Sequence, residues 1–387
     1  MKILMLCDAY FIDFQYQENL IAKSYIKLGY EVVVITNTNE KILDFINDIH
    51  DNSLPEKIEY DNGVKIYREP YSINILHRVR RFKNVKRILD QEKPDFLFSH
   101  DIQFNIGDLV DYKKKYNTRI IMDYHADFSN SGKNWVSINI LHKIIRKRYL
   151  YRYKKYIDKI YPVVPAGEEF LHKIYGISYD EMELLPLGCE YDECEKFRKE
   201  TDIIKLREEY GISPNDIVII TGGKFHKLKR TDLAVKAVKK INQKNVHMIV
   251  FGTADKNHEE YLKTMLQDAE GANIHFTGWA DSKKIYELMA ISDIALFPAS
   301  QSVLWQQSIG MHLPLIAGDA GGQDMSYLNQ NGNLIKIDAP DINEDFIKEI
   351  LLDLIQNPEK IESMKKGAEK TAKEYLDYSI IAKRTLS

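Results

Sequence analysis

A glycine pair and two lysines lie close together in the second half of this 387-residue chain, at Gly222, Gly223, Lys224 and Lys229. They follow an apolar run of β type and precede a helical pattern, so we expect a strand, a glycine turn and a helix. Backbone amides and the helix dipole at such a turn both face an incoming anion. Two lysines beside it suit a ligand with at least two negative charges, such as a diphosphate. The alternative is an ordinary turn with solvated lysines.

Histidines end two apolar runs in the first half of the chain. His125 follows one run, with Asp123 and Asp127 on either side of it, and His100 ends another, followed by Asp101. A carboxylate beside an imidazole can hold it in place or can pair with a basic side chain instead. We expect His125 to face a ligand. The alternative is a histidine that is only hydrogen-bonded inside the fold.

The elements that position these residues alternate between strand-like and helix-like patterns along the whole chain, which is typical of parallel α/β layering. In the first half we expect a helix over 17–28, closed by Gly29. The strands predicted in the first half are residues 2–7, 31–36, 96–100, 119–125 and 159–164. Those predicted in the second half are residues 217–221, 247–252, 273–278, 294–298 and 313–318.

The length of the chain favours two domains, because 387 residues are too many for one ordinary core. A Pro- and Gly-containing stretch followed by acidic residues places the boundary near Glu190. We expect a first domain over 1–190, completed by a C-terminal helix over 371–387, and a second over 191–370. Both are predicted to be Rossmann-like, doubly wound domains that face each other across a cleft. Ligands of such sheets lie at the carboxyl ends of the strands.

The composition excludes several classes of protein. A hydrophobic content of 44% with 29% charged residues is that of a globular chain, and no apolar run approaches the ~18 residues needed to span a bilayer. We expect a cytoplasmic protein with reduced cysteines. Its three cysteines lack metal spacing, and no Asp-x-Asp pair is placed to hold a cation, so no metal is expected. The glycines form neither a dinucleotide fingerprint nor a Walker loop.

Basic charge is concentrated in one region. Residues 70–160 hold 20 Lys and Arg against 9 Asp and Glu, although the whole chain has a net charge of −3. Within this region, residues 77–87 and 142–156 mix basic with apolar side chains at helical spacing, so we expect two basic amphipathic helices. Such helices suit the anionic surface of a membrane; the alternative is packing on a sheet with a solvated basic face. No nucleic-acid module accompanies the charge, so no nucleic-acid partner is expected.

Six segments together resemble a known family. They are FQYQENLIAKSYIKLGYEVVVIT, DYHADFSNS, VVPAGEEFLHKIYGIS, ELLPLG, GGKFHKLKRTDLAVKAV and HFTGWADSKKIYELMAISDIALFPA. In this order and spacing, nearly the full length resembles the GT-B glycosyltransferases of family 4, which are nucleotide-sugar-dependent and mostly retaining. The resemblance implies a transferase with a nucleotide diphosphate sugar as co-substrate and no other cofactor. It also implies a saccharide or lipid-linked acceptor at the inner face of the cytoplasmic membrane.

The resemblance also implies roles for residues. Lys224 takes the place of the family's arginine and Lys229 that of its lysine, and with His125 they are the expected catalytic residues. The expected acceptor-binding residues are Gln17, Glu18 and Asp127; the alternative for the first two is an ordinary acidic first helical turn. The expected donor-binding residues are Gly222, Gly223, Gly252, Ser302, Val303, Gln306 and Gln307. Trp279 either touches the nucleotide base or packs in the core, and Trp305 is expected to pack.

The chain departs from the family where two glutamates are usual, eight positions apart. Ala299 and Gln307 stand there instead. Gln307, or Gln306 if the loop shifts by one residue, can still hydrogen-bond a ribose. Ser300, Gln301 or Ser302 would then have to hold the sugar in place of Ala299. Two other functions therefore stay open: a non-catalytic GT-B module that binds a glycan or a partner transferase, and a sugar-nucleotide epimerase.

Overall fold

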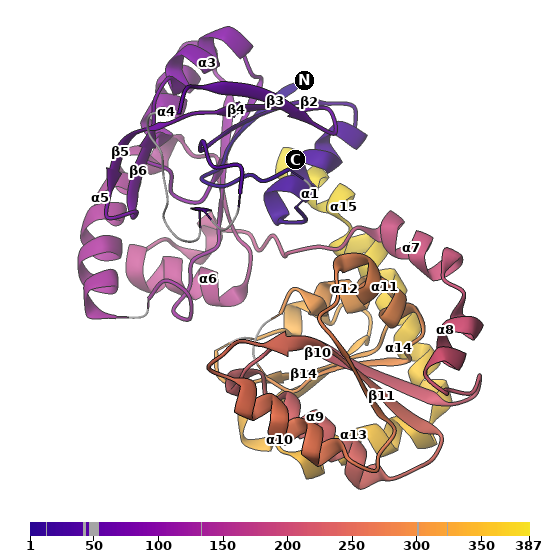
Figure 1. Ribbon diagram of the computed structural model, residues 1–387. Helices are drawn as coiled ribbons and strands as arrows, with labels where there is room; N and C mark the ends of the chain where they lie inside the picture. The colour runs from indigo at the N-terminus through magenta and orange to yellow at the C-terminus, as the bar shows by residue number, and fades with distance from the viewer. Residues whose placement is uncertain (13, 42–43, 46–53, 133, 300–301, 323) are drawn as a thin grey trace. The chain divides into compact units, whose positions relative to one another are not determined.

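The chain forms two compact units in a computed structural model, which describes residues 1–12, 14–41, 44–45, 54–132, 134–299, 302–322 and 324–387. The first unit is Met1–Leu187 with Tyr378–Ser387, and the second is Gly188–Asp377 (Figure 1). The sequence-based assignment of residues 371–377 to the first unit was wrong. Ala372 and Leu376 are buried in the core of the second unit, and the Leu376 carbonyl accepts a hydrogen bond of 2.9 Å from the amide of Cys189. Residues 188–190 also belong to the second unit.

The first unit is built on a seven-stranded sheet in the order β3-β4-β2-β1-β7-β8-β9. Its strands are β1 (Lys2–Leu6), β2 (Glu31–Thr36), β3 (Lys57–Asp61), β4 (Val64–Arg68), β7 (Phe96–His100), β8 (Arg119–Tyr124) and β9 (Lys159–Pro162). All neighbours are parallel except β3 and β4. The five strands predicted for this half of the chain are present, and each ends within two residues of its expected position.

Helices cover both faces of this sheet, as expected for a doubly wound unit (Figure 1). One face carries α3 (Val85–Glu92), α4 (Ile106–Tyr116), α6 (Pro165–Phe170) and a continuous helical stretch made of Ser137–Arg146, α5 (Lys147–Tyr153) and Lys154–Tyr156. The other face carries α1 (Gln17–Lys27) and the returning α15 (Tyr378–Leu386). The predicted basic helix over 142–156 is therefore helical.

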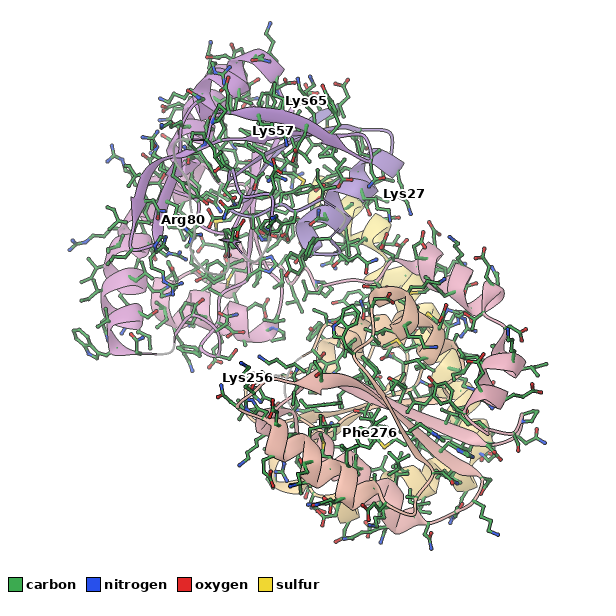
Figure 2. The ribbon with its side chains drawn as sticks, viewed as in Figure 1. Lys27, Lys57, Lys65, Arg80, Lys256 and Phe276 are labelled. Atoms are coloured by element: carbon green, nitrogen blue, oxygen red, sulfur yellow. The ribbon has the colours of Figure 1, made fainter. Side chains whose placement is uncertain are left out.

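The predicted basic helix over 77–87 was wrong. Residues 71–82 form a β-hairpin of β5 (Tyr71–Ile75) and β6 (Val79–Phe82), and α3 begins only at Val85. Asn84 has a φ of 37°, a left-handed conformation that interrupts any helix running through it. Arg80, labelled in Figure 2, ties the hairpin to the end of β1 through an ion pair of 2.6 Å with Asp8.

The second unit is a parallel six-stranded sheet in the order β12-β11-β10-β13-β14-β15. Its strands are β10 (Ile217–Phe225), β11 (Val246–Ala254), β12 (Ile274–Gly278), β13 (Ile294–Phe297), β14 (Leu315–Asp319) and β15 (Leu334–Asp338). One face packs against α9 (Thr231–Ile241), α10 (Glu259–Ala269) and α13 (Glu344–Gln356). The other packs against α7 (Tyr191–Glu200), α8 (Ile203–Glu209), α11 (Ser282–Ala290), α12 (Leu304–Gly310) and α14 (Pro358–Thr371).

In each unit the first strand lies inside the sheet, so the strand order reverses beside it. The reversal falls between β1 and β7 in the first unit and between β10 and β13 in the second. Ligands of open α/β sheets bind at the carboxyl ends of the strands at such a switch point.

Candidate active site

The glycine pair lies inside strand β10 and not in a turn, which corrects the sequence-based expectation. In register, Gly222 faces Phe251 and Gly223 faces Gly252 on β11. A Cβ atom on Gly222 would come within 3.0 Å of the Phe251 carbonyl oxygen, and one on Gly252 would do the same with that of Gly223. The glycines are thus required first by the close approach of two backbones. They also leave two positions near the carboxyl end of β10, just before Lys224, without a side chain.

The turn itself starts at His226. Its Nδ1 accepts a hydrogen bond of 3.0 Å from the amide of Leu228, a 3₁₀ turn covers Lys227–Lys229, and Arg230 has a φ of 51°. Helix α9 begins only at Thr231. The two lysines therefore lie on different elements, Lys224 on the strand and Lys229 in the turn.

Lys224 and Lys229 are held differently. The side chain of Lys224 is 62% exposed, and its Nζ lies 2.9 Å from Oδ2 of Asp255. Lys229 is half-buried, and desolvation lowers the pKa of its ammonium group. Asp255 also accepts a hydrogen bond of 2.7 Å from Nδ1 of His258. Sequence reasoning missed Asp255; the signal was its place just after β11, the strand paired in register with β10.

The loop between β13 and α12 lies at the same edge of the sheet. Leu304 reaches 3.5 Å from the point where a Cβ of Gly223 would stand, so α12 starts beside β10. Ser302 Oγ accepts a hydrogen bond of 3.3 Å from the Leu304 amide, and Val303 is 59% exposed. Ala299 is buried, whereas Ser300 and Gln301 lie outside the described residues. The structure thus brings Ser302 and Val303 to the end of β10.

The two glutamines of α12 have different surroundings. Gln306 is buried; its Nε2 lies 3.5 Å from the Tyr327 hydroxyl, and its Oε1 has no hydrogen-bond partner within the part of the chain that the structure describes. Gln307 is only partly buried. Trp305 packs in the core as expected, and Trp279 is 73% exposed, which rules out core packing. The donor roles of these residues stay predictions.

In the first unit a carboxylate joins the two histidines. Oδ2 of the buried Asp123 accepts hydrogen bonds of 2.9 Å from Nδ1 of His100 and 3.0 Å from Nε2 of His125. Oδ1 of Asp123 accepts one of 3.0 Å from the Asp101 amide. Glu18, in the first turn of α1, places Oε2 3.8 Å from Nε2 of His100. The strand ends β7 and β8 and helix α1 therefore converge at one point.

Burial and ion pairing determine the pKa values of His100, Asp123 and Glu18. Burial opposes a charged His100, but the carboxylates of Asp123 and Glu18 outweigh it and raise the pKa of His100 to about 10. Burial would raise the pKa of Asp123 too, yet the two histidines hold it well below its ordinary range. Burial raises the pKa of Glu18, an effect that His100 partly offsets. His100, Asp123 and His125 also have ligand atoms within 4.8 Å of one another, so they are the described residues that could hold a metal ion.

The predicted acceptor residues lie nearby with unequal surroundings. Gln17 is buried, and neither its Nε2 nor its Oε1 has a hydrogen-bond partner among the described residues. Such an unmet group costs about 1–3 kcal/mol, which a polar ligand or water would offset. Oδ1 of Asp127 accepts hydrogen bonds from the amides of Ser129 (2.7 Å) and Asn130 (3.0 Å), so this residue shapes the loop after β8. The acceptor role of Asp127 stays a prediction.

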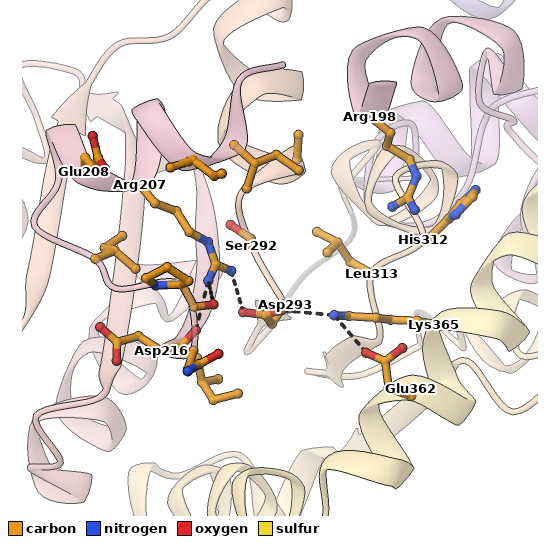
Figure 3. Close-up of a pocket in the computed structure, with 17 residues that line it drawn as sticks. Arg198, Arg207, Glu208, Asp216, Ser292, Asp293, His312, Leu313, Glu362 and Lys365 are labelled. Carbon is orange, nitrogen blue, oxygen red and sulfur yellow. Dashed lines mark hydrogen bonds and ion pairs between the residues drawn. The ribbon is translucent and has the colours of Figure 1, made fainter. Parts of the chain in front are cut away.

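A cavity of about 540 Å³ lies at the opposite edge of the second sheet (Figure 3). Asp293 at its centre pairs with Arg207 at 2.9 Å and with Lys365 at 3.0 Å. It borders Ile217, where β10 begins, and Leu313, just before β14. Ligands of doubly wound sheets bind at the carboxyl ends of the strands, so this cavity is not the expected donor site.

Two Rossmann-like units in one chain, each with polar residues at the carboxyl edge of its sheet, define the GT-B fold. The family model described as glycosyl transferases group 1 matches residues 202–371, and the model of glycosyltransferase family 4 matches residues 20–193. The chain belongs to this family of glycosyltransferases.

Individual proteins agree with that assignment. An alpha-galactosylglucosyldiacylglycerol synthase of Streptococcus pneumoniae is 23% identical over 339 residues, which cover 85% of this chain and 86% of the synthase. HepE of Anabaena, solved in complex with UDP, superposes with a TM-score of 0.66 at 15% identity and covers 100% of this chain and 98% of its own. WaaG, a glycosyltransferase involved in lipopolysaccharide biosynthesis, superposes with a TM-score of 0.58 at 16% identity, with 99% and 98% covered.

Proposed function

We propose that this glycosyltransferase moves a sugar from a nucleotide diphosphate sugar to a lipid-linked saccharide or glycan during the synthesis of a cell-surface polysaccharide or glycolipid. The observation that carries the proposal is the carboxyl end of β10, where Lys224 on the strand, Lys229 in the following turn and Leu304 at the start of α12 lie beside the glycine pair. Two cations at the switch point of a Rossmann-like sheet suit a diphosphate. A relative that makes a diacylglycerol glycolipid supports a lipid-linked acceptor.

The chemistry assigned to these residues is stabilisation of a leaving group. As the bond from the sugar C1 to the diphosphate breaks, negative charge grows on the phosphate oxygens. Lys224 and Lys229 stabilise that charge where it develops. In a retaining reaction the acceptor hydroxyl attacks from the leaving-group face, and the departing phosphate takes its proton. The lysines therefore supply positive charge without a metal ion.

In the first unit, His100, Asp123 and His125 form the group that orients the acceptor or the sugar. Its bond to Asp123 fixes the His125 ring, whose side chain is 26% exposed. The buried side-chain amide of Gln17, which has no partner among the described residues, offers its NH2 group as a donor and its carbonyl oxygen as an acceptor to sugar hydroxyls. Polar side chains that are neutral or already ion-paired hydrogen-bond the hydroxyl groups of a saccharide more readily than they bind an anion.

A panel of nucleotides tests the proposal directly. UDP, GDP, CMP and ADP are added separately to the full chain, and the unfolding midpoint is measured; a ligand that binds only the native state raises it. We expect one nucleoside diphosphate to raise the midpoint, and less so in Lys224→Ala and Lys229→Ala. Lys256→Ala, with a lysine beyond the end of β11, is the matched control. If no nucleotide raises the midpoint, the proposed donor site is wrong.

A non-catalytic GT-B module is the second candidate, and the buried, apolar Ala299 favours it because a polar group is missing where the family places a glutamate. Release of nucleoside diphosphate from a labelled nucleotide sugar distinguishes the two, since a module that only binds releases none. A sugar-nucleotide epimerase would instead convert the sugar without any saccharide acceptor. Analysis of the labelled products separates all three functions.

A further inference from the structure

The tip of the β5–β6 hairpin presents a leucine in an unusual conformation. Leu76 and His77 have φ angles of 49° and 54°, and the Arg78 amide donates a hydrogen bond of 3.0 Å to the Ile75 carbonyl. Hairpin turns with two positive φ angles favour Asn and Gly, not a large apolar residue. Leu76 is 83% exposed, more than any other large apolar side chain in the described part of the chain. Neither folding nor solubility explains a leucine there.

A second set of exposed apolar side chains lies on the helical stretch after residue 134. Trp135 is 69% exposed and Val136 59%, and Ile140 and Ile144 follow at 40% and 44%. Residues 137–146 are π-helical, with more than four residues in each turn, so positions four apart lie near one another on the helix surface. Trp at the end of an apolar stripe is typical of a membrane interface.

The hairpin tip and this helical stretch enclose a cavity of about 360 Å³ within the first unit. This volume lies within the roughly 300–1,000 Å³ of small-molecule sites. Its apolar lining includes Ile75, Leu76, Val79, Val136, Ile140 and Ile145. We call this surface, with Trp135, the hairpin–helix surface.

The described residues that line the cavity carry positive charge only: they include Arg78 and Arg146 and no Asp or Glu. Arg146 donates a hydrogen bond of 3.3 Å to the Arg78 carbonyl, its Nε is buried without a partner, and neither arginine has an ion pair among the described residues. Burial, together with these two arginines, lowers the pKa of His142 to about 4, so this lining residue is neutral. A ligand with one anionic group and apolar chains would match both the arginines and the apolar lining of the cavity.

We propose that the hairpin–helix surface binds an anionic phospholipid of a membrane, with the lipid phosphate at Arg78 and Arg146, an acyl chain against the apolar lining, and Leu76 and Trp135 inserted among neighbouring lipids. Within the described residues, no helix has the length and apolar character to cross a bilayer. This inference deepens the proposed function and rests on its choice of a lipid-linked acceptor.

The test uses the full chain and vesicles of phosphatidylcholine, alone or mixed with phosphatidylglycerol. Leu76→Asn is the decisive variant, because Asn adopts the left-handed turn more readily than Leu and the hairpin should fold at least as well. We expect at least a tenfold loss of affinity for the mixed vesicles, with an unchanged or raised unfolding midpoint. Leu266→Asn, at an exposed leucine of α10, is the control and should leave binding unchanged. Unchanged binding in Leu76→Asn would overturn the proposal.

Charge removal tests the phosphate site. We expect the double variant Arg78→Gln, Arg146→Gln to lose the preference for phosphatidylglycerol. The double variant Arg152→Gln, Lys155→Gln, which removes the same charge from the exposed end of the same helical stretch, should keep most of it. Equal losses in both would mean diffuse attraction and would overturn the lipid site. Nucleotide binding is measured on every variant, so failure of the donor site and failure of the membrane surface are distinguishable.

Discussion

Lys224 and Lys229 differ in their surroundings although both lie at the carboxyl end of β10. Lys224 is solvent-exposed and forms an ion pair with Asp255, whereas Lys229 is half-buried and its pKa is lowered by desolvation. A charge in a partly dehydrated place acts more strongly on a nearby phosphate than one in water. We therefore assign Lys229 the larger part of the leaving-group stabilisation and Lys224 the smaller.

Replacing Lys229 by Ala is expected to lower kcat/KM roughly 30- to 1000-fold, equivalent to about 2–4 kcal/mol of transition-state stabilisation, because the developing phosphate charge loses the less solvated of its two cations. Steady-state kinetics with the nucleotide sugar identified by the thermal-shift panel measures this. Lys227→Ala, an exposed lysine of the same turn, serves as the control and should change kcat/KM little. Wild-type turnover in Lys229→Ala would remove the proposed mechanism.

The pairing of His100 with Asp123 predicts a pH dependence of stability. The pKa of His100 rises from an ordinary 6.5 to about 10 in the fold, so its contribution is complete below pH 6.5 and is lost as the pH rises towards 10. Asp123→Asn removes the partner and should cost about 3–5 kcal/mol at neutral pH, as expected when a buried ion pair is broken.

Chemical unfolding of wild type and Asp123→Asn across pH 6 to 10 checks this. The difference between them should shrink as the pH rises through that window. Asp158→Asn, with a carboxylate more than a third exposed in the same unit, is the comparison and should cost less. A difference that stays constant with pH would show that His100 is not charged by Asp123.

At the scale of elements, apolar runs determine what can be predicted. Apolar runs in the sequence predict the buried strands β1, β2, β7, β8 and β9 directly. Strands β3, β4, β5, β6 and β15 were not predicted. Among them, β3 and β5 are half-exposed and mix polar with apolar residues, so they carry no such signal. Residues 77–87 combine arginines with scattered apolar residues, a pattern that fits a helix, whereas pairing with β5 determined the conformation of residues 79–82.

The candidate site was predictable where one segment carries its residues and not where strands bring distant ones together. Lys224 and Lys229 belong to a single strand and turn. The link from His100 to Asp123 depends instead on the register of β7 and β8, and that of Lys224 to Asp255 on the register of β10 and β11. A strand pairing has no local sequence signal.

Close packing of β10 and β11 yields a prediction for the second sheet. Gly252→Ala should cost more than ~4 kcal/mol of unfolding free energy, because the new Cβ would collide with the Gly223 carbonyl and the φ of 123° is strained for alanine. Gly271→Ala is the matched control: its φ is 78°, but nothing lies within 4 Å of the new Cβ. It should cost only about 1–2 kcal/mol. Equal costs in chemical unfolding would mean that backbone conformation, and not close packing, requires the glycine.

At the scale of the whole molecule, the chain passes between the units twice, after Leu187 and after Asp377. The last ten residues then complete the first unit. Tyr378, Ile381 and Ala382 are buried against the face that carries α1, and the Thr385 hydroxyl is hydrogen-bonded to that of Tyr25. Arg384 binds the carboxylate of Glu183 at 3.0 Å. A segment far along the sequence thus closes the core of the first unit.

Removing residues 378–387 should therefore unfold the first unit selectively. Burial of each large apolar side chain contributes about 1.5–3 kcal/mol, so losing two of them and the Arg384 contacts removes more than ~4 kcal/mol. The second unit keeps all its strands and its lysines, so the nucleotide that raises the wild-type midpoint should still stabilise it. Calorimetry with and without that nucleotide measures both units, and deletion of Ser387 alone is the control. If nucleotide binding disappears together with the first unit, the second unit does not hold the donor by its own residues, and the site assigned to β10 and α12 is incomplete.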